Sequence, residues 1–282
     1  MSSSVPSENI EYLLLGHLAK DLSPDGPRLG GGVAYSGLTA HAMGMRVGVV
    51  TAAGEELSVA PLVGLQLVCL PSPQSTTFEN LYAEGVRTQR VTATARPLTP
   101  ADVPPAWIRA GCVHLAPIAD ELPLDAAAAF PAARRFCTPQ GWLRRWDAAG
   151  QVTDHPWQRV LPALEGVNAA VLGWEDIGHE TNAALQLSEI VPILVLTAGA
   201  SGADLYLEGR SAHIDAPPAR QVDPTGAGDI FAAAFFVGLL RQDPPEVAAR
   251  RAAALAARSV EAIGLAGVPS AREIAALEVA AP

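Results

Sequence analysis

The sequence has no cluster of basic residues. Its 282 residues include 19 lysines and arginines against 29 aspartates and glutamates, which gives a formal net charge of −10. Nucleic acids and anionic membranes bind to clustered lysine and arginine side chains, so neither is an expected partner. A phosphate-bearing ligand is still allowed, because backbone amides bind anions without any positive side chain.

Signals for secretion or membrane insertion are absent too. Residues 1–9 are polar and rich in serine, with no basic stretch followed by an apolar one, so they predict a flexible tail and not a signal peptide. No apolar run is long enough to span a bilayer. We therefore expect a cytoplasmic protein.

Cysteine and histidine are few and show no paired spacing. Cys69, Cys112 and Cys137 lie far apart in apolar segments and form no C-x-x-C pair, which favours three buried thiols in a reducing compartment. His179 is followed by Glu180 but lacks the second histidine of a zinc-binding helix. The sequence therefore does not predict zinc-dependent hydrolysis.

Short apolar segments alternate with helical spacers along most of the chain. Strands are predicted over residues 12–15, 47–51, 67–70, 113–115, 136–138, 169–172 and 193–197. Buried strands that alternate with helices indicate an α/β fold with a doubly wound, mostly parallel sheet covered on both faces. No linker divides residues 10–282 into independent domains.

Two predicted hairpins interrupt this alternation. In residues 76–90, Phe78, Asn80 and Tyr82 fall on one face, and Gly85 offers a turn. This hairpin is interpreted as a β lid over a small ligand, with packing against the body of the domain as the alternative; it could also pair across a homodimer. The second hairpin covers residues 204–214, after which two long helices, over 227–240 and 245–262, are predicted to close the chain.

A run of seven residues, 223–229, leads into the first of these helices and reads Asp-Pro-Thr-Gly-Ala-Gly-Asp. The first amides of a helix have no partner inside it, the helix dipole adds positive potential there, and glycines leave those amides uncovered. A phosphoryl group would be stabilised at such a place. Asp229 would lie in the same turn, where a carboxylate can accept the proton of an attacking hydroxyl. An isolated G-x-G would indicate only a tight bend.

This run resembles the second signature of the ribokinase/PfkB carbohydrate kinase family, and the resemblance extends over nearly the whole chain. It implies an ATP-dependent kinase with a ribokinase-like fold, in which Asp229 is the catalytic base and the amides of Gly226, Ala227 and Gly228 form an anion hole. The implied cofactors are ATP and Mg²⁺. The implied acceptor is a small polyhydroxylated molecule, either a sugar, a polyol such as an inositol, or a nucleoside.

Residues 196–202 are similar to the family's strand-end loop that contacts the phosphates of ATP. A hydroxyl and two glycines at the end of a strand let a phosphate approach the backbone closely. The ATP-binding residues that the resemblance implies are Thr197, Gly199, Gly202, Thr225, Gly226 and Gly228. The helix over 252–260 resembles the stretch beside the family's adenine site, although packing also explains an alanine-rich helix.

The glycine pair Gly30-Gly31, followed by a helix of small residues to about Met43, resembles the sugar-binding turn of the family's first signature. Asp21 falls where the family places an aspartate that holds substrate hydroxyls. A carboxylate suits that role because it can accept hydrogen bonds from both hydroxyls of a vicinal diol. The alternative for Asp21 is an ordinary loop aspartate before Pro24.

The sequence departs from the family pattern in the acceptor region. Tyr35 stands where the family usually has asparagine, and residues 138–140, Thr-Pro-Gln, replace an Asp-x-Asn stretch. Together with the run 76–80, these residues are more similar to the inositol-kinase-like branch of the family. That resemblance implies contacts to the acceptor from Tyr35, Asn80 and Gln140.

The family's Asn-x-x-Glu motif, which orders Mg²⁺ and its waters, aligns with residues 173–176, Gly-Trp-Glu-Asp. The asparagine is missing and the acid is displaced. Asp176 is the implied metal-site residue and Glu175 its competitor, because Mg²⁺ keeps several waters and needs only one or two carboxylates. Two solvated loop acids are the alternative.

Three functions compete for these motifs, and phosphoryl transfer to a hydroxyl is the leading one. A catalytically silent binding or regulatory protein on the same fold is allowed by the departures at Tyr35 and Gly173, although a pure binder has no need of a base at Asp229. A Rossmann-type oxidoreductase would need G-x-G-x-x-G directly after the first strand, and the turn at Gly16 offers no such spacing.

Overall fold

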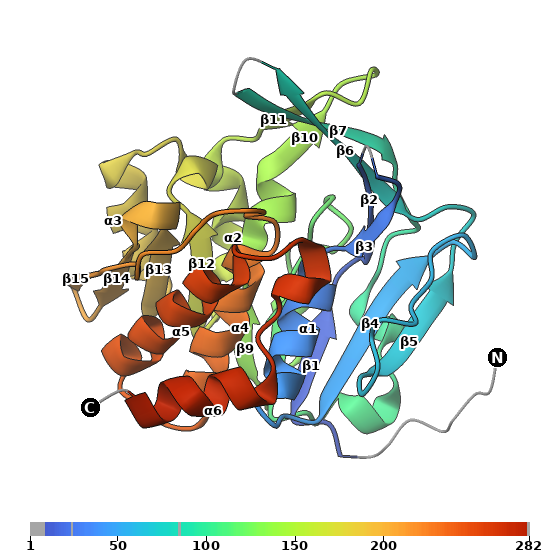
Figure 1. The fold of residues 1–282 in the computed structure, drawn as a ribbon. Coiled ribbons are helices and arrows are strands. Elements are labelled where there is room, and N and C mark those ends of the chain that lie inside the picture. The colour runs from blue at the N-terminus through green and yellow to red at the C-terminus, as the bar shows by residue number, and fades with distance from the viewer. Residues whose placement is uncertain (1–8, 24, 84–85, 281–282) are drawn as a thin grey trace.

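The computed structural model describes residues 9–23, 25–83 and 86–280, and only the backbone of 80–83, 86–88 and 278–280. At its centre lies one large twisted sheet (Figure 1). In spatial order its nine strands are β15 (Arg210–Ile214), β14 (Ala203–Leu207), β13 (Ile193–Thr197), β12 (Ala169–Gly173), β9 (Arg134–Cys137), β8 (Cys112–Leu115), β1 (Tyr12–Leu15), β4 (Val47–Ala53) and β5 (Gln66–Pro71). The strands from β13 to β5 pair in parallel, and β14 and β15 add an antiparallel edge.

The central strands are buried on both faces, which explains their continuous apolar runs. Along β1, Tyr12 and Leu14 join the apolar core on one face, and Leu13 and Leu15 join the core on the other. The described α-helices are α1 (Gly32–Ala42), α2 (Leu161–Leu164), α3 (Thr181–Ile190), α4 (Ala227–Leu240), α5 (Pro245–Ser259) and α6 (Ala271–Ala280). Residues of α1, α4, α5 and α6 belong to the first core, and residues of α2 and α3 to the second, so helices cover both faces of the sheet (Figure 1).

Short 3-10 helices fill several connections. They are η1 (Pro100–Asp102), η2 (Pro105–Trp107), η3 (Ala126–Ala129), η4 (Pro139–Leu143), η5 (Trp157–Val160), η6 (Glu175–Ile177), η7 (Gly199–Ser201) and η8 (Gly264–Gly267). Three of them, η4, η6 and η7, directly follow the carboxyl ends of β9, β12 and β13. They therefore bring polar loop residues to one edge of the parallel sheet, where ligands bind in open α/β folds.

A smaller sheet, called the lid sheet below, projects from the body and contains the hairpin predicted over residues 76–90 (Figure 1). Its strands, in spatial order, are β3 (Arg28–Gly30), β2 (Ala19–Leu22), β6 (Thr76–Ala83) and β7 (Val86–Ala93). A separate hairpin, β10 (Arg144–Trp146) and β11 (Val152–Asp154), lies beside β7. The turn predicted at Gly85 lies outside the described residues. The small core under this sheet contains Phe78 and Val91, so the lid does have packing of its own.

Several expectations need correction. A third helix, α6, follows the two that were predicted to close the chain, and α5 ends at Ser259 and not at 262. Asp21 lies on strand β2, where it pairs with Arg28 of β3, and not in a loop. Cys112 and Cys137 are buried, but Cys69 is exposed because β5 is the edge strand of the large sheet.

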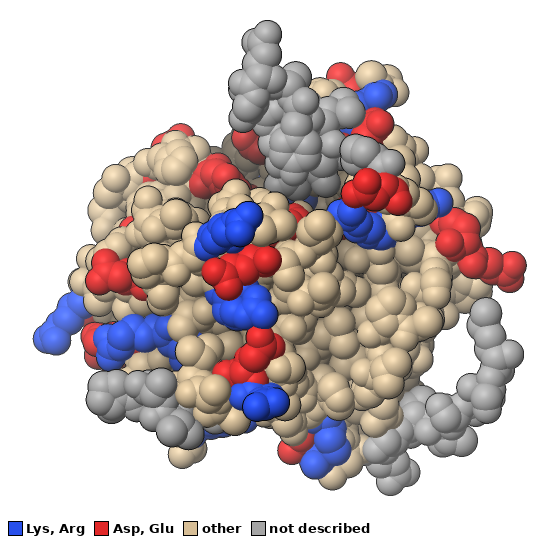
Figure 2. Space-filling view, viewed as in Figure 1, with Lys and Arg blue, Asp and Glu red and all other residues tan. Residues whose placement is uncertain are grey.

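Charges on the described surface are mixed. On the face seen in Figure 2, basic and acidic side chains lie interspersed over the helical layer, and no continuous basic surface is visible. Exposed ion pairs such as that of Arg258 with Glu273, at 2.8 Å, account for part of this pattern. Among the described residues, no helix has both the length and the apolar character that crossing a bilayer requires.

Candidate active site

A cleft of about 1230 Å³ opens between the carboxyl ends of β12 and β13 and the lid sheet. The predicted site residues that line it are Asp21, Gly31, Tyr35, Gln140, Glu175, Asp176, Thr197, Gly199, Gly202 and residues 225–229. Gly30 lies just outside the lining, and the side chain of Asn80 lies outside the described residues. The fold thus brings together the separate motifs that the sequence singled out.

The run 223–229 forms a turn and then the start of α4. Asp223 accepts a hydrogen bond from the Thr225 N–H at 3.0 Å and another from the Gly264 N–H at 2.9 Å, which ties the turn to the loop after α5. Gly226 is the N-cap of α4 and has a φ of 81°, a left-handed conformation that favours glycine. At Gly228, a Cβ would meet no atom within 4 Å, so the first turn of α4 is open toward the cleft.

Asp229 lies in this first turn, at the floor of the cleft. Its backbone carbonyl accepts a hydrogen bond from Ser36 on α1 at 3.1 Å, and its Oδ1 lies 2.9 Å from where a Cβ on Gly32 would be. Burial raises the pKa of the Asp229 carboxyl to about 7; the charge of Arg144 lowers it, and those of Asp21 and Asp176 raise it further. A carboxylate with a pKa near 7 is well matched to act as a general base at neutral pH.

Asp21 faces Asp229 from the lid side, and the glycine pair makes room for it. A Cβ on Gly30 would lie 2.0 Å from the Asp21 Oδ2, so only glycine at that position leaves space for the carboxylate. Gly31 has a φ of 96°, and a Cβ there would lie 2.7 Å from the Ala19 N and the His17 O. The pair therefore positions Asp21 and lets helix α1 begin directly at the cleft.

Tyr35 on α1 lines the cleft and lies against the start of α4. A Cβ on Gly226 would come within 2.3 Å of the Tyr35 ring, so the ring packs directly against the glycine turn. Burial, with the charges of Asp21, Asp223 and Asp229 nearby, raises the pKa of Tyr35. Its phenol stays protonated, and the side chain fills space beneath the motif.

Asp176 and Glu175 come from η6, directly after β12. The Asp176 Oδ2 accepts a hydrogen bond from the Gly173 N–H at 2.8 Å, and Glu175 is exposed. Burial raises the pKa of Asp176, against the opposing effects of that hydrogen bond, of Arg144 and of a hydrogen bond from Gln140. Gln140 thus contacts Asp176, and Asp176 is not a solvated loop acid.

A Mg²⁺ site is compatible with this arrangement. No cluster of three or more His, Cys, Asp or Glu side chains suited to a metal occurs in the part of the chain that the structure describes. Mg²⁺ does not need one, because it keeps several waters and takes one or two carboxylates together with substrate phosphates. Asp176, with Glu175 beside it, offers those oxygens at the edge of the cleft.

The other half of the cleft combines a glycine loop with an apolar wall. Thr197 ends β13, and η7 follows it with Gly199 at a φ of 54° and no atom within 4 Å of a Cβ there. Gly202 has a φ of 90° and packs against the Ile214 carbonyl. Opposite this loop, the lining consists of small apolar residues of α5 and the chain after β15: Ala253, Ala256, Ala257, Pro217 and Pro218.

Besides Ala19 and Asp21 of β2, the lid sheet contributes Phe78 and Gln89 to the lining. Phe78 lines the cleft, as the predicted inward-facing side of the hairpin requires. It is also buried among Ala19, Val91 and Ile118, as the alternative of packing against the domain requires. The side chain of Tyr82, like that of Asn80, lies outside the described residues. Among the described side chains of β6 and β7, Phe78 and Gln89 are therefore the ones placed to contact a ligand in the cleft.

Trp174 and Arg144 are among the lining residues that were not assigned a role from the sequence. Trp174 follows Gly173, which stands where the family has asparagine, and donates from its Nε1 to the Asp204 Oδ2 at 2.8 Å. Arg144 begins β10 and lies close enough to Asp229 and Asp176 to lower the pKa of both. The only sequence signal for Arg144 was its position shortly after Gln140.

Residues 168–271 match the model of the pfkB family carbohydrate kinases. An inositol 3-kinase of Zea mays is 38% identical over 106 residues, which are 36% of this chain and 26% of that protein. The chain thus aligns with about a quarter of that relative's length. A cytidine kinase of Thermococcus kodakarensis is 25% identical over 265 residues, which cover 86% of this chain and 92% of that one.

Among solved structures, a pyrophosphate-dependent kinase in the ribokinase family, complexed with a pyrophosphate analog and myo-inositol, superposes with a TM-score of 0.81. The superposition covers 94% of this chain and 99% of that one at 22% sequence identity, and so it shows a shared fold. The family model matches the segment that carries Asp176, Thr197 and Asp229, and the ribokinase fold covers nearly the whole chain. The chain therefore has the ribokinase fold, and its segment 168–271 is similar to the pfkB family carbohydrate kinases.

Proposed function

We propose that the protein transfers the γ-phosphoryl group of ATP to a hydroxyl of a small polyol, with Asp229 as the base. The observation that carries this proposal is the position of Asp229, a carboxylate with a pKa near 7 in the first turn of α4 beside an uncovered glycine. A base and an anion-binding helix end in one cleft are the two elements that phosphoryl transfer to a hydroxyl needs.

The reaction follows from these positions. The acceptor oxygen attacks the γ-phosphorus while its proton passes to a carboxylate oxygen of Asp229. The bond from phosphorus to the bridging oxygen breaks, and ADP leaves with that electron pair. The N–H groups at the start of α4 stabilise the charge on the transferring group. Mg²⁺, when bound beside Asp176, would neutralise part of the negative charge on the donor's phosphate oxygens.

An inositol-like polyol fits the acceptor side of the cleft. The Asp21 carboxylate can accept hydrogen bonds from two adjacent hydroxyls, and Asp229 faces a third position. Phe78 and Ile118 form an apolar wall beside them, which suits the C–H face of a carbon ring. The likeness to an inositol 3-kinase and to a kinase bound to myo-inositol supports this acceptor class.

ATP is the donor that the lining favours. The slot between α5 and the chain after β15 is formed mainly by alanines and prolines, with Gln221 beside them. Such apolar walls suit a flat aromatic base better than a pyrophosphate. Pyrophosphate is the second candidate, because a structurally similar kinase of the ribokinase family uses it.

The test is transfer by the purified chain from either donor to myo-inositol, ribose and cytidine, followed by ³¹P NMR of the products. We expect a phosphomonoester of inositol with ATP and Mg²⁺. Binding of acceptor and donor without any phosphomonoester would instead identify a silent binding protein on this fold. Turnover with pyrophosphate but not with ATP would show that pyrophosphate is the phosphoryl donor.

A further inference from the structure

The cleft carries far more negative than positive charge. Its described lining includes the carboxylates Asp21, Glu175, Asp176 and Asp229, whereas Arg144 is the one lysine or arginine in that lining. A phosphate donor brings several further negative charges into this space. A metal ion offsets part of the repulsion at the edge where Asp176 lies, but the interior near Asp229 has one cationic side chain.

Arg144 lies where the transferred group would pass. Its guanidinium is half-buried, and its charge acts both on Asp229, the proposed base, and on Asp176, beside the donor. A group moving from donor to acceptor travels between those two carboxylates. The guanidinium presents five N–H donors and keeps its charge at all relevant pH values, so it suits the equatorial oxygens of a phosphoryl group.

The backbone that carries Arg144 is firmly held on its inner side. Trp142 is fully buried and donates from its Nε1 to the Leu122 carbonyl at 2.7 Å, and its own carbonyl accepts from Arg159 at 2.9 Å. A Cβ on Gly141 would lie 2.4 Å from the Ile118 N, so η4 packs directly against the strand end. Such support fixes the direction of the following side chain, as preorganised electrostatic catalysis requires.

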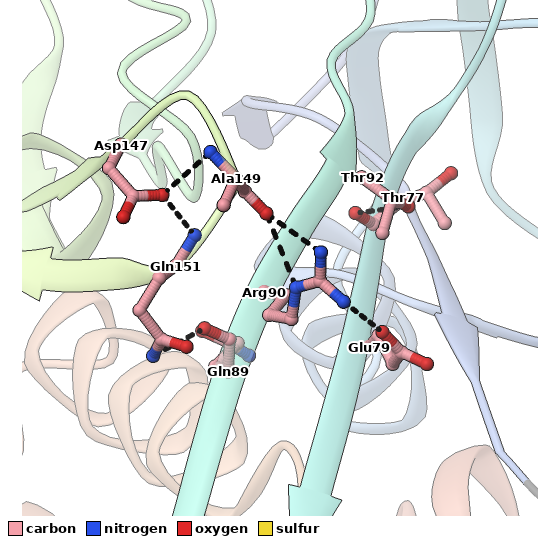
Figure 3. A network of polar contacts seen from close by, with 8 residues as sticks. All are labelled: Thr77, Glu79, Gln89, Arg90, Thr92, Asp147, Ala149 and Gln151. Atoms are coloured by element: carbon pink, nitrogen blue, oxygen red, sulfur yellow. Dashed lines mark hydrogen bonds and ion pairs between the residues drawn. The ribbon is translucent and has the colours of Figure 1, made fainter.

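Arg144 begins the β10–β11 hairpin, and the turn at the far end of this hairpin is joined to the lid sheet (Figure 3). Arg90 of β7 donates from Nη2 to the Ala149 carbonyl at 2.8 Å, and the Val91 N–H donates to the Gly150 carbonyl at 2.9 Å. Asp147 accepts from the N–H groups of Ala149 and Gln151, both at 2.9 Å, and so fixes the turn that presents those carbonyls. The lid and the strand that begins with Arg144 are therefore mechanically connected.

On the proposed phosphoryl transfer, we infer that Arg144 is a catalytic residue whose guanidinium binds the equatorial oxygens of the phosphoryl group during transfer. It forms and breaks no covalent bond and exchanges no proton. Its contribution is charge: the guanidinium is closest to the phosphoryl oxygens when the new O–P bond is partly formed and the bond to the leaving ADP is partly broken. An arginine in that position accelerates phosphoryl transfer by roughly 10³-fold or more.

The test compares Arg144→Gln with Arg145→Gln, a matched control on the same strand. Arg145 is exposed, lies outside the lining of the cleft and donates from its Nε to the Thr153 Oγ1 at 3.3 Å. We expect Arg144→Gln to lower kcat by at least roughly a hundredfold at pH 9, where Asp229 is ionised, with the acceptor KM within a few-fold of its original value. Arg145→Gln should keep the wild-type kcat. Guanidinium chloride at millimolar concentration should restore part of the kcat of Arg144→Ala.

The outcomes separate this inference from the proposed function. A wild-type chain that transfers no phosphoryl group from ATP or pyrophosphate removes the proposed function and this inference with it. An active wild type whose Arg144→Gln variant reaches the same kcat plateau at high pH removes the inference alone, because Arg144 is then only a counter-ion for Asp176 and Asp229. If Arg144→Gln melts far below the wild type, Arg144→Lys takes its place, because lysine keeps the charge but lacks the planar guanidinium with its several N–H donors. An unreduced kcat in the folded Arg144→Lys variant would overturn the inference that the guanidinium binds the phosphoryl oxygens.

Discussion

Gly226 lies against the ring of Tyr35 so closely that a Cβ on the glycine would come within 2.3 Å of the Tyr35 Cδ1. The contact joins helix α1 to the turn that begins α4. It also explains why the position where the family usually has asparagine can hold a tyrosine here: the ring fills the space under a residue that has no side chain. Two glycines of the same motif can therefore be expected to respond differently to substitution.

Gly226→Ala should unfold the start of α4, whereas Gly228→Ala should not. At Gly226 the φ of 81° and the contact with Tyr35 both oppose a Cβ, for a cost on the order of 2–4 kcal/mol or roughly 5–10 °C in Tm. At Gly228 a Cβ meets nothing within 4 Å, and alanine favours the helix. Its methyl group would narrow the approach to the first amides, so KM for the donor should rise while Tm holds. Equal melting temperatures of the two variants, measured by calorimetry, would contradict this account.

Asp229→Asn should reduce kcat by several orders of magnitude and leave donor affinity within a few-fold of the wild type. The amide cannot accept the acceptor's proton, but it keeps the size and position of the carboxylate. Asp125→Asn, an exposed aspartate at η3, serves as the control. Near-normal turnover of a folded Asp229→Asn enzyme would remove Asp229 from the mechanism.

Activity should rise with pH along a limb centred near pH 7, the pKa of Asp229, because only the ionised carboxyl is a base. Stability should change in the opposite direction. Asp229 in the unfolded chain ionises at its ordinary pKa of 3.8, but in the folded chain it keeps its proton until about pH 7. Rising pH between those values therefore favours unfolding. The Tm gain of Asp229→Asn over the wild type should be larger at pH 8 than at pH 5; a gain independent of pH would show that Asp229 is not buried as described.

Asp176→Ala should raise the Mg²⁺ concentration for half-maximal activity by roughly tenfold or more, and Asp21→Ala should leave it nearly unchanged. Asp176 lies on the donor side with Glu175, while Asp21 lies on the acceptor side with Gly30. Asp21→Ala should instead raise the acceptor KM. Metal titrations at fixed donor concentration check this, and coinciding curves for the two variants would mean that the metal assignment is wrong.

Ala256→Phe should raise the KM for ATP by roughly tenfold and leave any activity with pyrophosphate unchanged. A phenyl ring on this face of α5 would fill the slot that the nucleotide base is proposed to occupy. Ala254→Phe, on the same helix but outside the lining, controls for damage to α5. An unchanged KM for ATP in Ala256→Phe would mean that the nucleotide base does not bind in this slot.

The sequence predicted the elements whose signals are local. Strand β1 and helix α4 begin and end where the pattern indicated, because a run of buried residues bounded by glycine needs no distant partner to be recognised. The short strands β2, β3, β10 and β11 were not predicted, because they are only partly buried, carry no continuous run of apolar residues and depend on pairing with other strands.

The same reason limited the site. Asp229 and the glycines of its motif were identified because they are adjacent in sequence. Arg144 was not, because its place in the cleft depends on η4 packing against Ile118 and on the turn after β10 contacting the lid sheet. Gly30 was interpreted as a ligand contact, but its missing Cβ makes room for the Asp21 carboxylate, a relationship that appears only once β2 and β3 are paired.

The junction between Arg90 and the 147–151 turn has a consequence for fidelity. Because the junction ties the lid to the outer turn of a hairpin whose inner end carries Arg144 and is held by η4, the hairpin would restrain the lid sheet over the cleft. A restrained lid would keep stray water away from the proposed site of phosphoryl transfer. The exclusion of water would in this way be built into the hairpin, without a separate checkpoint elsewhere in the molecule.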